Sequence, residues 1–166
     1  DIVALQEVSR GWAISGRLDM LTWLSQRLEM PYVSGPTADS FWGNALLSSY
    51  PIIQSENREL PTSDLPIRRG FLSVIVDLGY GEHLRVIATH FHHSRDPRDP
   101  LAYESDVRQL QAHAVVEFWN GAGRTVLLGD LNAEANAPEN MLLRQAGLLD
   151  VMLSSELPPA LTWRSN

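Results

Sequence analysis

The chain has 166 residues, 44% of them hydrophobic and 20% charged, a length that favours a single domain with a sizeable core. It contains no cysteine, which excludes thiolate nucleophiles and cysteine-ligated metal sites. The formal net charge of -7 has the wrong sign for a protein that grips nucleic acid through general electrostatics. No apolar run reaches the roughly 18 residues that a membrane helix needs.

Apolar runs and helical spacing predict nine elements along the chain. Short, nearly continuous hydrophobic runs suit strands buried on both faces, while leucines at three- and four-residue steps predict a helix. Turn-forming residues at 49–51 and 79–82 join two strand pairs as hairpins. In chain order these are a strand at 2–5, a helix at 18–30, strands at 42–48, 52–60, 71–78 and 84–89, a helix at 107–119, a strand at 125–128 and a helix at 138–146.

Strand pairs interleaved with helices predict a layered α/β sandwich with mixed sheets rather than a doubly wound nucleotide-binding fold. Four polar residues follow predicted buried strands within a few positions: Glu7, His90, Asp130 and Asn132. A single residue of this kind often only begins a solvated loop. Four of them together indicate a site, because strand ends hold side chains more rigidly than free loops do.

The chemistry of these side chains suits a phosphate ester and a hard metal ion. In extended backbone Asp130 and Asn132 point to the same side, where a carboxylate can hold a water molecule and a carboxamide can donate to a phosphate oxygen. The alternative is an Asx-turn, in which both only bond their own backbone. Glu7 is an oxygen ligand of the type that Mg²⁺ prefers.

A histidine cluster and an arginine pair add further candidates. His90 can donate to a phosphate in the transition state. His90, His92 and His93 lie close enough in sequence for a zinc site. Zinc is disfavoured because no carboxylate stands at ligand spacing, and His92 and His93 can simply be loop residues. Arg68 and Arg69 form a basic spot available to a phosphate, with a solvated pair as the alternative.

Five motifs follow one another along nearly the whole chain: Gln6-Glu7, the run 43–48 that contains Asn44, Thr89-His90, Gly129-Asp130-Leu131-Asn132 and Leu161-Thr162-Trp163. In this order they resemble the endonuclease/exonuclease/phosphatase superfamily of metal-dependent hydrolases. The resemblance implies an α/β (α+β) fold, a DNase I-like four-layer sandwich of two mixed β-sheets flanked by helices. It also implies hydrolysis of phosphate esters by a metal-activated water.

The resemblance assigns a role to each site residue. Glu7 would bind Mg²⁺ or Mn²⁺, His90 would contact the scissile phosphate, Asp130 would orient or deprotonate the attacking water, and Asn132 would hold the phosphate. The expected substrate-binding residues are Asn44, Arg69 and His92.

Residues 18–60 look closest to the C-terminal domain of membrane proteins involved in GPI-anchor lipid remodelling. The net charge of -7 favours a small or lipid-like phosphate ester over nucleic acid, and the resemblance implies a soluble domain attached to an upstream membrane region. A nuclease and an inert binding domain of the same fold are the alternatives. The compartment and the oligomeric state are left open.

The superfamily carries a first strand with an Asn before its Gln-Glu motif and a closing Ser-Asp-His motif. Neither lies between Asp1 and Asn166. We therefore expect residues 1–166 to form one domain truncated at both ends, lacking that first strand and the C-terminal strands, with impaired activity by itself.

Overall fold

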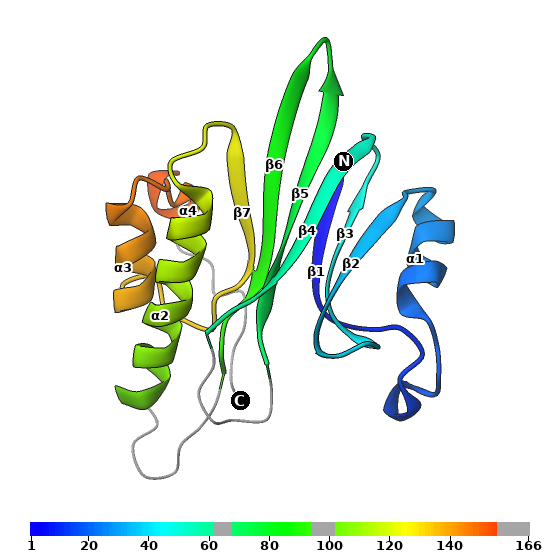
Figure 1. Ribbon diagram of the computed structural model, residues 1–166, viewed down its shortest axis with the longest axis horizontal. Helices are drawn as coiled ribbons and strands as arrows, with labels where there is room; N and C mark the ends of the chain where they lie inside the picture. The colour runs from blue at the N-terminus through cyan, green and yellow to red at the C-terminus, as the bar shows by residue number, and fades with distance from the viewer. Residues whose placement is uncertain (62–67, 94–101, 156–166) are drawn as a thin grey trace.

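The computed structural model describes residues 1–61, 68–93 and 102–155, which form four layers stacked face to face (Figure 1). Helix α1 (Met20–Leu28) covers a three-stranded sheet, and that sheet packs against a four-stranded sheet. Helices α2 (Ala102–Trp119) and α3 (Pro138–Gln145) cover the other face of the four-stranded sheet. The predicted α+β sandwich with two sheets flanked by helices is confirmed.

The three-stranded sheet is antiparallel and has the order β1-β3-β2. Its strands are β1 (Ile2–Ser9), β2 (Tyr32–Asp39) and β3 (Trp42–Ser48). The central strand β3 is buried from Gly43 onward, which explains its apolar run without alternation. Helix α1 begins at Met20 rather than Leu18, because the Asp19 carboxylate accepts a hydrogen bond from the Thr22 N–H at 3.0 Å and caps the helix.

The four-stranded sheet has the order β4-β5-β6-β7. Its strands are β4 (Ile52–Glu59), β5 (Gly70–Gly79), β6 (Glu82–His90) and β7 (Thr125–Asp130). This sheet is mixed, as predicted, because β6 and β7 run parallel with α2 as the crossover while the other neighbours are antiparallel. The core between the two sheets consists of Leu46, Leu72, Val74, Val76, Val86 and Ala88.

A second core lies between the four-stranded sheet and the helices. It is built from Leu60, Phe71, Ile87, Phe91, Ala112, Val115 and Leu143. A buried ion pair between Arg108 and Glu139 connects α2 to α3. The short helices η1 (Ala13–Ser15) and α4 (Val151–Ser154) complete the described elements. Within the described ranges, no helix combines the length and apolarity needed to cross a membrane.

Two sequence-based expectations about the strands were wrong. The segment 49–51 does not close a hairpin, because β3 and β4 belong to different sheets and the chain passes from one sheet to the other there. Strand β2 was not predicted, since Gly35 and Pro36 weaken its strand pattern. It lies at the end of its sheet, beside β3 alone, where a proline is tolerated.

Candidate active site

The predicted site residues meet at one end of the two sheets, where β1, β6 and β7 finish (lower end of the strands in Figure 1). His90 and Asp130 are register partners in the parallel pair β6-β7. The His90 Nδ1 lies 3.8 Å from the Glu7 Oε1, and the His90 Nε2 lies 3.8 Å from the Asp130 Oδ2. The structure therefore brings together Glu7, His90, Asp130 and Asn132.

Glu7 occupies an irregularity in β1. The pairing of β1 with β3 shifts register between Leu5 and Val8, and Glu7 has a φ of 56°. This left-handed conformation is unusual for a glutamate. The predicted strand 2–5 thus extends to Ser9 around a bulge, and 53% of the Glu7 side chain is exposed.

The segment after β7 approaches β6 closely. Gly129 has a φ of 147°, and a Cβ at this position would lie 1.9 Å from the Thr89 carbonyl oxygen. Asp130 and Asn132 do not share extended backbone, because the strand ends at Asp130 and Asn132 has a φ of 49°. The Asx-turn is present: the Asn132 N–H donates to the Asp130 Oδ1 at 2.9 Å.

The Asx-turn does not use the Asn132 side chain, which reaches β6. Its Nδ2 donates to the Phe91 carbonyl at 3.0 Å and lies 2.9 Å from the His90 Nε2. The His90 ring is buried, with the residue 5% exposed. Burial, followed by the positive charge of Arg69, lowers the pKa of His90 to about 4, although Asp130 and Glu7 act in the opposite direction.

Arg69 precedes β5 and is buried, so the alternative of a solvated Arg68-Arg69 pair is wrong for Arg69. Arg68 is exposed and pairs with Glu59 at 2.7 Å, whereas Arg69 is only 5% exposed. The Arg69 Nη1 lies 3.1 Å from the His90 Nδ1 and 3.5 Å from the Glu7 Oε1. No local sequence signal separates the two arginines, since burial of the second depends on β1 and β6.

The expected substrate-binding residues Asn44 and His92 are both buried. The Asn44 Nδ2 donates to the Gly70 carbonyl at 2.8 Å, so this side chain connects the two sheets directly behind Arg69. The His92 N–H donates to the Gln111 Oε1 at 2.7 Å. Neither His92 ring nitrogen has a hydrogen-bond partner within the described part of the chain. Strand β6 ends at His90, so His92 does not share a strand face with it.

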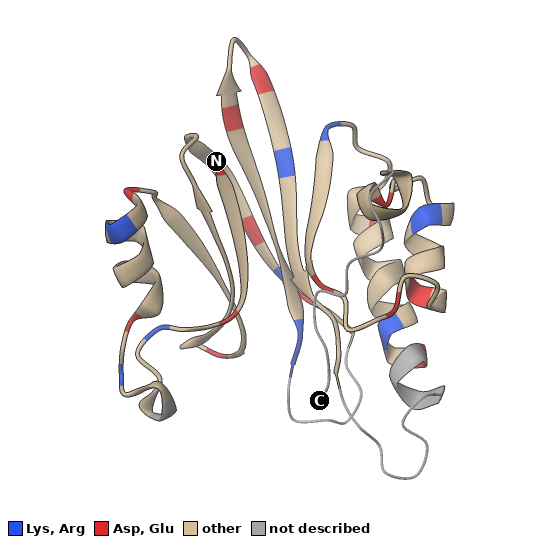
Figure 2. Ribbon diagram, turned by 180° about the vertical axis from the view of Figure 1, so that it is seen from behind, with Lys and Arg blue, Asp and Glu red and all other residues tan. Residues whose placement is uncertain are grey.

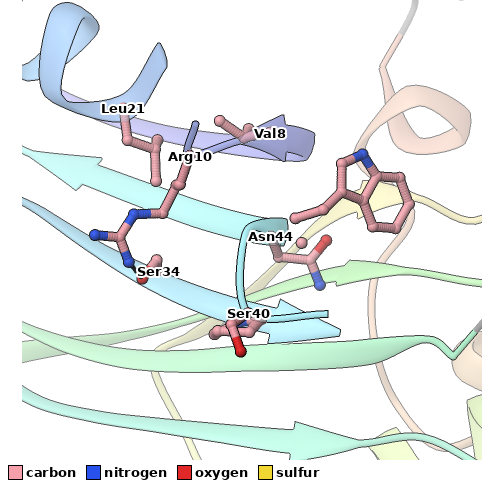
Figure 3. A pocket seen from close by; sticks show the side chains of 9 residues that line it. Val8, Arg10, Leu21, Ser34, Ser40 and Asn44 are labelled. Carbon is pink, nitrogen blue, oxygen red and sulfur yellow. Dashed lines mark hydrogen bonds between the residues drawn. The ribbon is translucent and has the colours of Figure 1, made fainter. Parts of the chain in front are cut away.

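The Trp42 ring lies beside Arg69, and the Trp12 ring lies near Trp42. The Arg69 guanidinium carbon lies 5.6 Å from the centroid of the Trp42 ring, which is 6.4 Å from the Trp12 ring. A pocket of ≈ 10 Å³, lined in part by Arg10, Asn44 and Trp42, lies in the same region (Figure 3). This volume suits a single water molecule and is too small for a phosphate ester.

The donor set at Glu7 fits a hydrated Mg²⁺ ion. Among the described residues, no group of three or more His, Asp or Glu side chains could hold a metal ion. Mg²⁺ commonly takes one or two carboxylates and keeps several waters, and the exposed Glu7 carboxylate leaves room for them. The motif at Leu161-Thr162-Trp163 lies outside the described residues.

The family described as "PGAP2IP, C-terminal nuclease-like domain" matches residues 1–156. The chain belongs to this family. Protein cwh43 of Schizosaccharomyces pombe (strain 972 / ATCC 24843) is 29% identical over 155 residues, a match that covers 91% of this chain and 15% of that protein. The chain thus spans a small part of the length of this relative.

Solved structures show the same fold. A beta hairpin deletion mutant of beta toxin from Staphylococcus aureus has a TM-score of 0.70 at 21% identity, over 92% of this chain and 61% of that chain. An endonuclease/exonuclease/phosphatase from Beutenbergia cavernae DSM 12333 has a TM-score of 0.68 at 20% identity, over 87% of this chain and 44% of that chain. The domain therefore has the DNase I-like fold of the endonuclease/exonuclease/phosphatase superfamily.

Proposed function

We propose that this family member hydrolyses phosphate esters with the help of Mg²⁺ or Mn²⁺, and that its substrate is small or lipid-like rather than a long nucleic acid. The supporting observation is the network around His90, which joins a carboxylate, a guanidinium and a carboxamide within 3.8 Å of one imidazole. Phosphoryl transfer depends mainly on positioning and electrostatic stabilisation, which such a network can supply.

In this proposal Asp130 holds the attacking water. Its Oδ1 already accepts the Asn132 N–H at 2.9 Å, and its Oδ2 faces the His90 Nε2 at 3.8 Å. Because 55% of its side chain is exposed, a water molecule can reach the carboxylate and pass a proton to it. His90 and Asn132 then donate to the phosphate oxygens.

Glu7 would hold the divalent ion, through the exposed part of its carboxylate. When bound, the ion would supply Lewis-acid stabilisation of the negative charge on the phosphate. Arg69 keeps Glu7 in place through their contact at 3.5 Å. Asn44 acts on the substrate through Arg69, since it fixes the adjoining Gly70 carbonyl.

His92 is the remaining substrate-binding candidate. It is 2% exposed, and its ring nitrogens have no partner within the described ranges, so a role in substrate binding requires the site to open enough for a substrate oxygen to reach this ring. Burial is the largest cause that lowers the pKa of His92, and the positive charges of Arg69 and Arg108 follow. A positive surrounding suits an anionic oxygen.

The preference for a small or lipid-like ester is supported by charge and by aromatic side chains. The net charge is -7, the chain has no lysine, and the arginines of the described residues are scattered over the ribbon rather than gathered at the site (Figure 2). Trp42 lies beside Arg69, Trp12 lies near Trp42, and Phe41, which precedes Trp42, is 55% exposed. An apolar substituent would find more contact there than a polyanion would.

The test is a Mg²⁺-dependent assay on a small phosphodiester, a phosphomonoester, a phospholipid in micelles and supercoiled plasmid. We expect Asp130→Asn to lower kcat roughly 100-fold or more on the small or lipid-like ester, because the acid-base group is lost. Asp77→Asn is the matched control: Asp77 lies in β5 close to the opposite end of that strand, where it accepts the Gly79 N–H.

Each outcome of this assay decides between functions. Cleavage of plasmid alone would replace the proposal with a nuclease. Absence of hydrolysis on all four substrates would favour an inert binding domain if a longer chain, with the superfamily's first strand and closing Ser-Asp-His motif, is inactive as well. An unchanged kcat in Asp130→Asn would remove Asp130 from the mechanism while leaving the activity itself established.

A further inference from the structure

Arg69 is held in one position by contacts on several sides. Its guanidinium lies over the Trp42 ring, its Nη1 contacts Glu7, and its carbonyl accepts the Leu60 N–H at 2.9 Å. The neighbouring Gly70 carbonyl accepts the Asn44 amide. A long side chain that is 5% exposed and fixed in this way presents its N–H groups in a defined direction.

Both ring nitrogens of His90 face groups that donate hydrogen bonds. The Arg69 Nη1 lies 3.1 Å from Nδ1, and the Asn132 Nδ2 lies 2.9 Å from Nε2. A neutral imidazole has one acceptor nitrogen and one N–H, so it can satisfy only one of these two donors. A guanidinium has no acceptor atom, and a charge-assisted hydrogen bond is the stronger of the two.

We propose that Arg69 is a positioning residue that fixes His90 in the tautomer with its proton on Nε2. The Arg69 Nη1 donates to Nδ1, which therefore carries no hydrogen, and the ring proton is placed on the nitrogen nearer to Asp130 and Asn132. The tautomer follows from the geometry alone, whereas its catalytic consequence rests on the proposed function.

The consequence is a pair of converging donors. With the proton on Nε2, this N–H and the Asn132 amide group stand 2.9 Å apart, and the nearest carboxylate oxygen, of Asp130, is 3.8 Å from Nε2. The Asn132 amide cannot turn over without losing its bond to the Phe91 carbonyl. Two donors facing one another are satisfied when they share an anionic oxygen, so Arg69 prepares the site for a phosphate oxygen.

The decisive measurement is ¹⁵N NMR of the histidine-labelled protein at neutral pH, in which the shifts separate a protonated from an unprotonated ring nitrogen. We expect His90 to show an unprotonated Nδ1 and a protonated Nε2. Adding inorganic phosphate should move the resonances of Nε2 and of the Asn132 side-chain amide, and leave Nδ1 almost unchanged. A protonated Nδ1 in the resting protein would overturn the inference, whether or not the protein hydrolyses anything.

Substitutions test whether Arg69 is the cause. Arg69→Met keeps an apolar side chain over Trp42 but has no donor, so we expect a signal from protonated Nδ1 and a fall in kcat of roughly 10- to 100-fold, with KM less affected. Arg69→Lys retains a donor and should restore the Nε2–H tautomer and part of kcat. Arg68→Met is the control, because Arg68 is exposed and pairs with Glu59.

A solely structural role for Arg69 would lower stability without changing the tautomer. If Arg69→Met folds and keeps the Nε2–H tautomer, the positioning role is wrong. If Arg69→Met does not fold, the comparison of Arg69→Lys with the parent protein still tests the positioning role. Loss of the Nε2–H tautomer of His90 in Arg69→Lys would overturn that role. The expected tautomers without hydrolysis in any variant would support the inference and contradict the proposed function.

Discussion

At the scale of single residues, the site contains two left-handed backbone conformations, of which only the one at Glu7 is unfavourable for its side chain. Glu7 and Asn132 have φ values of 56° and 49°. Asparagine tolerates the left-handed region, but for most other side chains it costs roughly 1–2 kcal/mol. Glu7 thus combines an unfavourable backbone with a carboxylate placed beside Arg69 and His90. Strain of this kind is common at functional sites.

This strain can be measured with two variants that both lose the carboxylate. Because glycine, unlike glutamine, adopts this left-handed backbone without strain, we expect Glu7→Gly to be more stable than Glu7→Gln by about 1 kcal/mol in urea unfolding. Both variants should lose the Mg²⁺-dependent change in tryptophan fluorescence that we expect of the parent protein. Equal stability of the two variants would argue against strain, and a preserved Mg²⁺ response in both would argue against Glu7 as the ligand.

At the scale of elements, the approach of β7 to β6 sets the position of Asp130. The parallel pairing of His90 with Asp130 follows the pairing of Thr89 with Gly129, where the backbones come so close that no Cβ fits. Gly129 therefore connects the fold to the site: a side chain there would separate the two strands and carry Asp130 away from His90.

We predict that Gly129→Ala lowers the free energy of unfolding by about 3 kcal/mol or more, through steric overlap and a backbone at φ 147°. Gly123→Ala is the matched control, because a Cβ there meets nothing within 4 Å. Urea unfolding of both variants tests this prediction. Equal stabilities would show that β6 and β7 can separate at little cost.

At the scale of the whole molecule, the charge distribution separates small substrates from polyanions. The net charge is -7, and Arg69 is the one arginine that the described structure brings against His90. Binding that neutralises a single phosphate has a weak dependence on salt, whereas a protein with 6–10 phosphate contacts loses about 10³–10⁵ in affinity between 50 and 200 mM salt.

We predict that kcat/KM for a small phosphodiester falls by no more than about three- to fourfold between 50 and 200 mM salt at constant Mg²⁺, because a single phosphate has no condensed counterion atmosphere to release. The measurement is initial rates across this range, with a short single-stranded oligonucleotide as the comparison substrate. A steep decline on the oligonucleotide together with a higher kcat/KM than on the phosphodiester would contradict the small-ester preference.

The sequence by itself determined the elements with strong periodicity, the family and four residues of the site. Apolar runs such as 43–48 and helical spacing through α2 are local properties, so they could be read without the fold. Glu7, His90, Asp130 and Asn132 could be named because each lies in a recognisable motif close to the end of an apolar run.

Only the tertiary structure decided which strands share a sheet, and that Arg69 rather than Arg68 is buried. The turn before Pro51 has the same local chemistry whether the next strand pairs with β3 or joins the other sheet, and the long-range pairing with β5 determines the outcome. Arg69 is buried because β1, β6 and Trp42 surround it, and these are contacts between segments far apart in the chain. Local patterns carry no information about such contacts, whose energies arise from packing.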